Sequence, residues 1–590
     1  MKLVLVEGSV ALKSHGVVNV LELNWGDLDT ECENVIYILR PEAKATMQVA
    51  SQISQAAPRN HSFELHFVPK RSFLSEQILR NQGVFDLVRI FEYPLGFIPY
   101  DTDVLSLGLD DAFAQVSLQS DDSCLIYSAR ALLQLQNVLG AIPDIKVKGD
   151  HSKKVLDMIL RMRLEAEEEK VSHFGESDES DDDSVDFSGL AGDEKELDGL
   201  KSDLEFGSGL RRLEGLSGQI DSLLLIDRNI DLVTPLCTAL TYESVLDNII
   251  GIRNGHLSVD TDLVDPTAPK KGSKTLLSLN SSDHIYKEIR DMNIEGVLSF
   301  LNGKAREIKD NWQDVKGKEV QELYGYVQNR LRSHIIDSQL LPRHINIVNR
   351  IRDTTVYDRP FRKMWTVERD ILQGGNQLAY IEEAIARQES WTKPIRLACL
   401  QSLVQNGIPA AQLDSLRKAI VQTYGYELIF TLNNLERLGM LKPKTSSSTW
   451  NGLVSSFKLL PTLGDVSKPE DISYVTSGYA PLSVRVVQLA IRPGWENGKD
   501  LLKKLGGRSI NKVKQPGIEI AEDSLPRKKK KVMMVFFTGG ITFAEIAALR
   551  FVAKQEDCPY DILIASTSIM NGKSILKSIA HEMENRLKPF

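Results

Sequence analysis

The stretch SLLLIDRNIDLVTPLCTALTYESVLDN, residues 222–248, decides the fold. It opens with an unbroken apolar run, residues 223–226, which is too short to cross a membrane and lacks helical spacing. Such a run is typical of a strand buried on both faces, as in a parallel α/β sheet. Asp227, Arg228 and Asp231 follow at the carboxyl end of this predicted strand, the edge where open α/β sheets bind ligands.

The N-terminal part of the chain alternates strand and helix patterns. Apolar runs predict strands at residues 17–23, 35–39 and 63–68, and helical spacing predicts helices at residues 41–55 and 72–83. This alternation favours a parallel sheet with helices on its faces.

The same patterning returns near the C-terminus, where residues 532–537 and 561–565 read as buried strands. Between them and the opening stretch, residues 285–441 are mostly helical. We therefore expect residues 210–247 and 470–590 to share one sheet that a helical block interrupts. The helices expected in that block are 297–312, 320–333, 367–387, 394–405 and 413–424.

Composition bounds the class of protein. The 590 residues are 42% apolar and 26% charged, which is ordinary for a soluble globular chain, and no run of 18 apolar residues occurs. The five cysteines are scattered without a CxxC pair, so the sequence favours a reducing cytosol and argues against disulfides or a thiolate zinc site.

An acidic segment stands out from the rest of the chain. Residues 165–205 hold 17 acidic and 3 basic side chains, so the remaining chain is mildly basic although the total charge is −9. The low-complexity composition of residues 172–209 predicts a disordered loop. Ser177, Ser180 and Ser184 lie among its acids, so it is either a phosphorylation target or a solvated spacer.

One near-motif for nucleotides has to be weighed. Residues 567–574, TSIMNGKS, follow a predicted strand and end like a phosphate-binding P-loop, GxxxxGK[ST]. Thr567 replaces the first glycine of that motif, at a turn that a β-branched residue resists. Nucleotide binding through residues 567–574 is the alternative hypothesis.

The charged residues after the opening strand allow two interpretations. Asp227, Arg228 and Asp231 could do acid–base chemistry, or they could form a fixed ion-pair joint between elements, since arginine holds carboxylates bidentately. The sequence contains no HExxH zinc motif and no GxSxG elbow, and nothing assembles a nucleophile, base and oxyanion donor. We therefore favour the structural joint, with no catalytic residue, metal or cofactor.

Several longer stretches together resemble one family. They are LLLIDRNIDLVTPLCTALTYESVLDNI, LNSSDHIYKEIRDMNI, IVQTYGYELIFTLNNLERLGML, DISYVTSGYAPLSVRVVQLA and FFTGGITFAEIAALRF. In this order they are similar to the Sec-one/Munc-eighteen (SM) family, most of all to its vacuolar protein-sorting branch. The resemblance runs over residues 35–571.

The resemblance implies an arch of two parallel-sheet α/β domains, with a largely helical third domain inserted into the second. The implied domains are residues 1–115, residues 116–247 with 470–590, and residues 248–469. It also implies that the family's leading helix and first strand are absent. Periodicity alone predicts a strand at residues 3–6, whereas the resemblance makes that segment the end of a helix.

The implied function is not enzymatic. SM proteins bind SNARE proteins, template their assembly and promote membrane fusion, here at the late endosome, lysosome or vacuole. In this branch the SM subunit joins a HOPS or CORVET tethering complex by docking on an α-solenoid subunit. The implied location is cytoplasmic, with membrane contact through the complex and no nucleic-acid partner.

Two surfaces follow from the resemblance. A hairpin at residues 295–335 matches the SNARE-templating region, and its basic face carries Lys304, Arg306, Lys309, Lys316 and Lys318. The second surface would meet the solenoid subunit, and it carries Arg417, Tyr424, Tyr426 and Ile429. The alternatives are an ordinary solvated helix face for the first and core tyrosines for the second.

Overall fold

The structure is a computed structural model. It describes residues 16–175, 219–264, 274–315 and 331–580, apart from residues 22, 29, 31, 57–60, 356, 463, 466–467 and 512–529. The chain divides into two compact units, Met1–Tyr100 with Arg130–Leu132, and Asp101–Ala129 with Leu133–Phe590. The segments 3–6 and 176–209, including Ser177, Ser180 and Ser184, lie outside the described residues, as do Lys316 and Lys318.

The first unit is built on a three-stranded parallel sheet, β1-β2-β3. Its elements are β1 (Asn34–Leu39), α2 (Ala43–Ala56), β2 (Ser62–Phe67), α3 (Phe73–Asn81), η3 (Phe85–Leu87) and β3 (Val88–Glu92). The predicted strands at 35–39 and 63–68 and both predicted helices are confirmed. The strand predicted at residues 17–23 is wrong: the described residues there are irregular, and Val18 and Leu21 are exposed instead of packing on a sheet.

The second unit contains a sheet of order β11-β6-β7-β12-β13-β5-β4. The strands are β4 (Ile98–Asp101), β5 (Val104–Ser106), β6 (Asp144–Lys148), β7 (Ser222–Asp227), β11 (Ser509–Ile510), β12 (Lys531–Thr538) and β13 (Tyr560–Ser566). β7 pairs in parallel with β6 on one side and β12 on the other, and all six of its residues are buried. The predicted sharing of one sheet by the two distant segments is therefore confirmed.

Helices and short turns accompany this sheet. They are α4 (Ala112–Leu118), α5 (Ser123–Leu139), α6 (Asp150–Gly175), η5 (Arg228–Ile230), α8 (Val233–Leu236), η6 (Ile472–Val475), α21 (Leu482–Leu489), η7 (Ala490–Gly494), α22 (Lys499–Lys503), α23 (Phe543–Lys554) and α24 (Gly572–Ile579). α23 starts with a capping box in which Thr542 and Glu545 satisfy each other's backbone amides. Helix α23 packs against β13 of the sheet and against η6 and α21, which follow the helical block in sequence.

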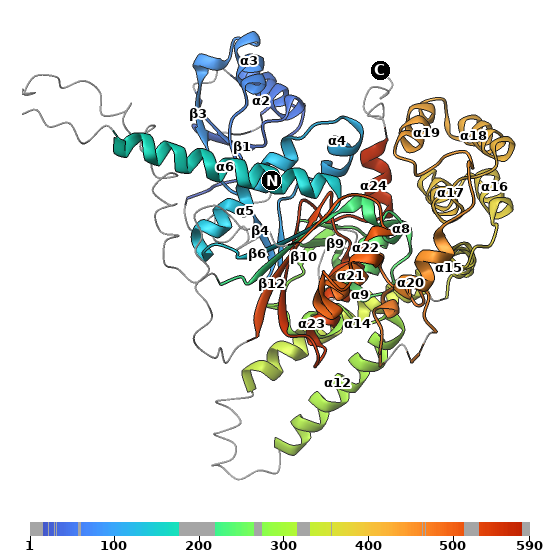
Figure 1. The fold of residues 1–590 in the computed structure, drawn as a ribbon. Helices are drawn as coiled ribbons and strands as arrows, with labels where there is room; N and C mark the ends of the chain where they lie inside the picture. The colour runs from blue at the N-terminus through green and yellow to red at the C-terminus, as the bar shows by residue number, and fades with distance from the viewer. Residues whose placement is uncertain are drawn as a thin grey trace, which may run out of the picture. The chain divides into compact units, whose positions relative to one another are not determined.

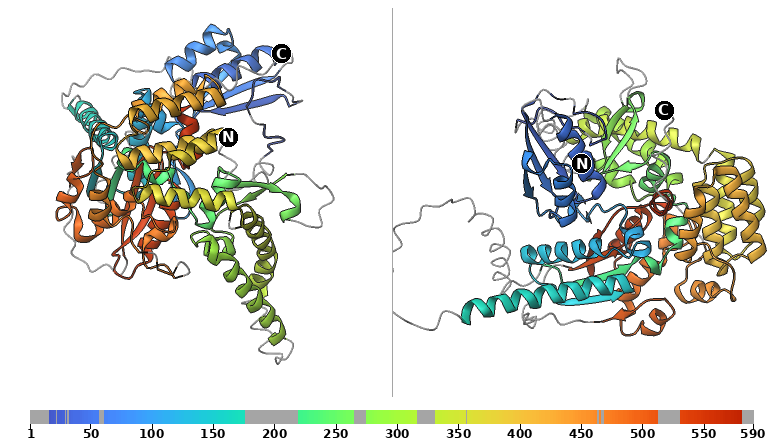
Figure 2. Two further views of the ribbon diagram at one scale, coloured as in Figure 1. Left: turned by 90° about the vertical axis from the view of Figure 1, so that its right-hand side faces the viewer. Right: turned by 90° about the horizontal axis from the view of Figure 1, so that it is seen from above.

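The inserted block begins with α9 and is mostly helical (Figures 1 and 2). Its elements are α9 (Tyr242–Ile249), β8 (Ile252–Arg253), β9 (His256–Asp260), α10 (Thr261–Val264), β10 (Lys274–Ser278), α11 (His284–Ile289), α12 (Ile294–Val315), α14 (Leu331–Thr354), α15 (Arg359–Leu372), α16 (Leu378–Ala386), α17 (Thr392–Gln405), α18 (Ala410–Tyr424), α19 (Leu428–Arg437) and α20 (Trp450–Phe457). The small antiparallel sheet β10-β9-β8 was not predicted.

One helix prediction in this block is wrong. The single helix expected at residues 367–387 is two helices, α15 and α16, because Gly374 adopts a φ of +94° and ends the first. The positive φ favours glycine at position 374, and a Cβ on Gly375 would displace the Asp370 carboxylate.

Helices α12 and α14 pack side by side over a shared apolar core (Figure 1). Val297 and Leu301 of α12 face this core together with Ile347 and Ile351 of α14. The helix predicted at 297–312 is thereby confirmed, while the one predicted at 320–333 lies outside the described residues except for its last three positions, which begin α14.

Candidate functional site

Arg228 lies at the carboxyl end of β7 and is almost fully buried. Its Nη1 donates to Glu545 Oε2 of α23 at 2.8 Å and to the Gly540 carbonyl at 3.3 Å, and its Nη2 donates to the Asp231 carbonyl at 2.5 Å. A Cβ on Gly539 would come within 2.9 Å of the Arg228 side chain, which explains the glycine pair after β12. The guanidinium thus ties the end of β7 to the start of α23.

The two carboxylates beside Arg228, those of Asp231 and Glu545, also accept hydrogen bonds from other groups. Asp231 accepts from the amides of Thr234 at 2.9 Å and Ser483 at 3.0 Å, and from the Thr234 hydroxyl. Glu545 accepts from the Thr542 amide and hydroxyl, both at 2.9 Å, and from the Ser483 hydroxyl. Both carboxylates are buried and accept at least three hydrogen bonds each, so they hold neighbouring elements together and are not presented to a substrate.

Asp227 belongs to a separate set of contacts. Its carboxylate accepts from the amides of His151 at 2.9 Å and Asn229 at 3.0 Å, and His151 Nδ1 lies 3.2 Å away. Gly149 packs so closely that a Cβ there would come within 2.1 Å of the Asp227 side chain. The structure therefore brings Arg228 and Asp231 together but directs Asp227 toward the start of α6.

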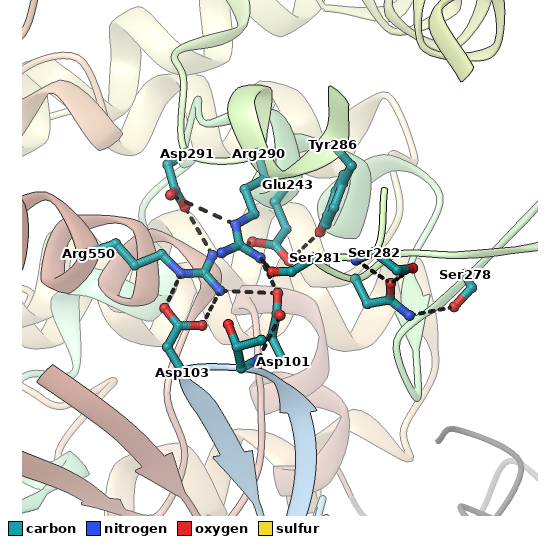
Figure 3. Close-up of polar contacts among 12 residues, drawn as sticks. Asp101, Asp103, Glu243, Ser278, Ser281, Ser282, Tyr286, Arg290, Asp291 and Arg550 are labelled. Carbon is teal, nitrogen blue, oxygen red and sulfur yellow. Dashed lines mark hydrogen bonds and ion pairs between the residues drawn. The ribbon is translucent and has the colours of Figure 1, made fainter. Parts of the chain in front are cut away.

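A second buried charge cluster was not predicted from the sequence (Figure 3). Arg550 of α23 binds Asp103 through two hydrogen bonds, 2.8 Å from Nε and 3.0 Å from Nη2, and its Nη1 lies 3.0 Å from Asp291 and 3.4 Å from Glu243. Arg290 contacts Asp101 and Asp291 in the same cluster. These residues come from segments up to 447 positions apart, so no local pattern could have linked them.

The P-loop-like segment is filled by the protein itself. The Thr567 side chain is buried and accepts the Gly539 amide at 3.0 Å. The amides of Lys573 and Ser574, which a phosphate would need, donate to the Asn571 side chain at 3.0 and 2.8 Å. A Cβ on Gly572 would meet the Pro235 carbonyl oxygen at 2.7 Å, so backbone packs where a phosphate cradle would open. This geometry gives no support to nucleotide binding.

The basic residues predicted on the hairpin differ in their surroundings. Lys304 Nζ lies 3.5 Å from Glu288 and 3.7 Å from Glu307, so its charge is partly neutralised. Arg306 and Lys309 are exposed, and the described residues supply neither with an ion-pair partner. They lie three positions apart on α12, on the same side of the helix.

The residues predicted for the solenoid-facing surface are also split. Arg417 Nη2 is bound to Glu436 at 2.6 Å, which joins α18 to α19, and Tyr424 is half-buried. Tyr426 and Ile429 are exposed at 61% and 43%, and Phe430 joins them at 46%. Phe430 was missed, although its spacing of four from Tyr426 is the signal that could have found it.

The described residues hold no helix long and apolar enough to cross a membrane. In the same part of the chain, no group of three or more His, Cys, Asp or Glu side chains is arranged to bind a metal ion.

Comparisons with known proteins agree on one family. A model described as the Sec1 family matches residues 6–578. The chain is 34% identical to the vacuolar protein sorting-associated protein 33A of Rattus norvegicus, over 98% of this chain and 91% of the relative. It is 32% identical to the vacuolar protein-sorting-associated protein 33 homolog of Arabidopsis thaliana, over 94% and 88%.

Two solved structures share the fold at lower identity. The Unc18–syntaxin 1 complex of Monosiga brevicollis is 18% identical, with a TM-score of 0.52 and coverage of 93% of this chain and 87% of that one. The SM protein Vps45 in complex with the Qa SNARE Tlg2 is 15% identical, with a TM-score of 0.52 and coverage of 93% and 88%. A parallel sheet, a second and mostly parallel sheet, and a helical block inserted into the second unit are thus the SM fold.

Proposed function

Because the chain belongs to the Sec1 family, we propose that it binds SNARE proteins and promotes their assembly during membrane fusion in vacuolar or endosomal sorting. The observation that carries this proposal is the family match over residues 6–578 together with relatives named for vacuolar protein sorting. Solved SM proteins of the same fold are complexed with syntaxin 1 and with the Qa SNARE Tlg2. The protein acts as a binding partner and not as an enzyme.

The SNARE-binding surface in this proposal is the exposed side of α12. Arg306 and Lys309 are exposed and have no ion-pair partner among the described residues, while Val297 and Leu301 on the opposite side fix the helix to its core. An amphipathic helix laid along such a face would be held by charge pairs at its rim. Lys304 contributes less, since Glu288 and Glu307 already neutralise it. Lys316 and Lys318 lie outside the described residues, and their part in SNARE binding stays a prediction from the sequence.

Pull-down with the SNARE domains of a vacuolar or endosomal bundle tests this surface. We expect Arg306→Glu combined with Lys309→Glu to weaken binding at least tenfold at low salt, and we expect salt to weaken the wild-type interaction. The matched control is Lys573→Glu combined with Lys577→Glu, which reverses two exposed charges on α24. No SNARE binding by the wild-type chain would refute the proposal; equal binding by both double variants would remove α12 from it.

We also propose that the protein works as a subunit of a HOPS- or CORVET-like tethering complex, docked on an α-solenoid subunit. The docking surface would be the apolar patch formed by Tyr426, Ile429 and Phe430 at the start of α19. Leu428, Leu432 and Leu435 on the other side of this helix are buried, so the patch is presented by a fixed element. Aromatic side chains of this kind often dominate interface energies.

Co-purification with the solenoid subunit tests the patch. Ile429→Arg and Tyr426→Ser should each abolish or strongly reduce complex formation without lowering thermal stability, because both side chains are exposed. Tyr357→Ser is the control, since Tyr357 is 62% exposed elsewhere in the helical block. Complex formation that survives both patch substitutions would contradict this docking site.

The domain boundaries and the cellular location are also proposed. We propose the domain limits 1–115, 116–247 with 470–590, and 248–469, with β5 of the first segment pairing into the sheet of the second domain. We also propose a cytoplasmic protein that is recruited to late endosomal, lysosomal or vacuolar membranes through its complex. The structural joint predicted for Asp227, Arg228 and Asp231 is proposed to act in two parts: Arg228 and Asp231 hold the end of β7 to the start of α23, and Asp227 holds it to the start of α6.

A further inference from the structure

The cluster formed by Arg290 and Arg550 with their four carboxylate partners lies next to the start of α12. Arg290 and Asp291 immediately precede the Met292-Asn293 turn that leads into α12, and both contact groups of the sheet-containing part of this unit (Figure 3). The backbone supports the same joint, because the Glu243 amide donates to the Arg290 carbonyl at 3.1 Å. Any change in the cluster therefore acts where α12 begins.

Negative charge exceeds positive charge in this buried cluster. The two guanidiniums of Arg290 and Arg550 face four carboxylates, those of Asp101, Asp103, Glu243 and Asp291. Lys554 approaches Asp291 only at 3.9 Å from an exposed position. Carboxylates that lie close together away from water disfavour one another's charged form, and binding a proton neutralises one of them.

Glu243 is the carboxylate best placed to take that proton. It is buried on α9, and its contact with Arg550, at 3.4 Å, is longer than the contacts that Asp103 and Asp291 make with the same guanidinium. Burial raises the pKa of Glu243 to about 7, against the opposing effects of Arg550 and of the Tyr286 hydroxyl, which donates to the carboxylate. Asp101 differs: burial raises its pKa, but Ser281 and Arg290 outweigh that and hold it below its usual range.

The same network reaches α14 at His344, in the middle of that helix. Tyr286, the donor to Glu243, stacks on the buried His344 ring at 6.3 Å between centroids. His344 of α14 is hydrogen-bonded to the Tyr242 hydroxyl and to the Asp283 carboxylate, each at 3.0 Å. The titratable and charged groups around Glu243 and its partners are Tyr242, Asp283, Tyr286, Arg290, Asp291, His344, Asp101, Asp103, Tyr474, Arg550 and Lys554.

We propose that this cluster is a proton-linked clasp: Glu243 takes up one proton, and the protonated cluster holds the start of α12 and the part of α14 around His344 more tightly than the fully charged cluster does. The proton neutralises part of the excess negative charge while leaving Arg550 its two-fold contact with Asp103 and its contact with Asp291. Where α12 binds SNAREs, as proposed above, the clasp makes the rigidity of the binding surface depend on pH.

Hydrogen exchange of the full chain tests the clasp independently of any SNARE. After correction for intrinsic exchange, protection of amides in α9, α11 and the first turns of α12 should fall about tenfold between pH 6 and pH 8 in the wild type, as expected for one proton whose pKa moves from about 4.5 to about 7. Glu243→Gln should remove this pH dependence, whereas Glu556→Gln, an exposed substitution near the end of α23, should preserve it.

A second variant keeps the test decisive if Glu243→Gln folds poorly. Tyr286→Phe removes the hydroxyl that stabilises the charged carboxylate, so the loss of protection should move to higher pH while the ring stays in place. Protection that is equal at pH 6 and pH 8 in the wild type, or a tenfold change that persists in Glu243→Gln, would overturn the clasp. SNARE binding measured on the same samples bears on the proposed function alone.

Discussion

Arg228 and Glu545 form a buried ion pair across 317 positions of sequence, with 2.8 Å between Nη1 and Oε2. Both side chains are at most 1% exposed, and one follows β7 while the other opens α23. Since β7 and β12 are neighbours in the sheet, this pair locks the two halves of a domain that the helical block separates in sequence.

Removing one partner of this pair leaves a charge buried without compensation. We therefore expect Glu545→Ala to lower the free energy of unfolding by about 3–5 kcal/mol, measured by urea denaturation. The control is Asp557→Ala, which breaks the exposed pair with Arg492 and should cost less than about 1 kcal/mol. A Glu545→Ala protein within about 1 kcal/mol of wild type would contradict a locking role.

Asp227 provides a second test of the joint. Asp227→Ala leaves the amides of His151 and Asn229 without their acceptor, so we expect a loss of about 1–3 kcal/mol in unfolding free energy. SNARE binding should fall only in proportion to the folded fraction, which circular dichroism and pull-down together measure. Weak SNARE binding by a fully stable Asp227→Ala protein would point to direct contact instead.

The sheet of the second unit could be predicted because its strands carry strong local signals. Residues 223–226, 532–537 and 562–565 are apolar runs bounded by charged or hydroxyl side chains, and burial on both faces requires such runs. The helix break at Gly374 was missed because apolar spacing continues across it, although the Gly374-Gly375 pair is a turn signal that could have placed the break.

The partners within the candidate site could not be predicted from the sequence. Arg228 and Asp231 follow β7 in the sequence, but Glu545 reaches them only because β7 and β12 pair in parallel. Glu243 and Arg550 carry no motif, and 307 positions separate them. The pairing of distant strands decides which charged residues meet, and the spacing of residues along the sequence does not show that pairing.

The cysteines should differ sharply in reactivity. Burial raises the pKa of Cys124 to about 12 and raises those of Cys237 and Cys399, and a protonated buried thiol is a poor nucleophile. Cys32 is only half-buried. Mass spectrometry after brief native treatment with a maleimide should find Cys32 modified first, whereas early modification of Cys399 would show that the helical block opens.

Nucleotide binding should be absent at residues 567–574. Asn571 already accepts the Lys573 and Ser574 amides, so a phosphate would have to displace a capping side chain. Titration with a fluorescent ATP analogue should give no saturable signal, and Lys573→Ala should change nothing. Saturable binding that disappears in Lys573→Ala would revive the alternative hypothesis.

The contact between Asp283 and His344 predicts a pH-dependent contribution to stability. Burial raises the pKa of Asp283, but the hydrogen bond and charge of His344 and the amides of Tyr286 and Ile285 outweigh burial and hold that pKa below its usual value. A carboxyl whose pKa is depressed by folding stabilises the protein above its unfolded pKa, near 3.8, and loses that contribution as pH falls through the folded pKa.

Asp283→Asn isolates this charge, because asparagine still caps α11 and still offers an oxygen to His344. We expect the variant to be less stable than wild type by about 1–2 kcal/mol at pH 7, and the difference to persist to about pH 4 and to shrink below it. Urea unfolding at pH 7, 5, 4 and 3 measures both curves, with Asp500→Asn at an exposed position as the control. A stability difference between the two proteins that stays constant down to pH 3 would mean that the charge of Asp283 does not stabilise its contact with His344 of α14.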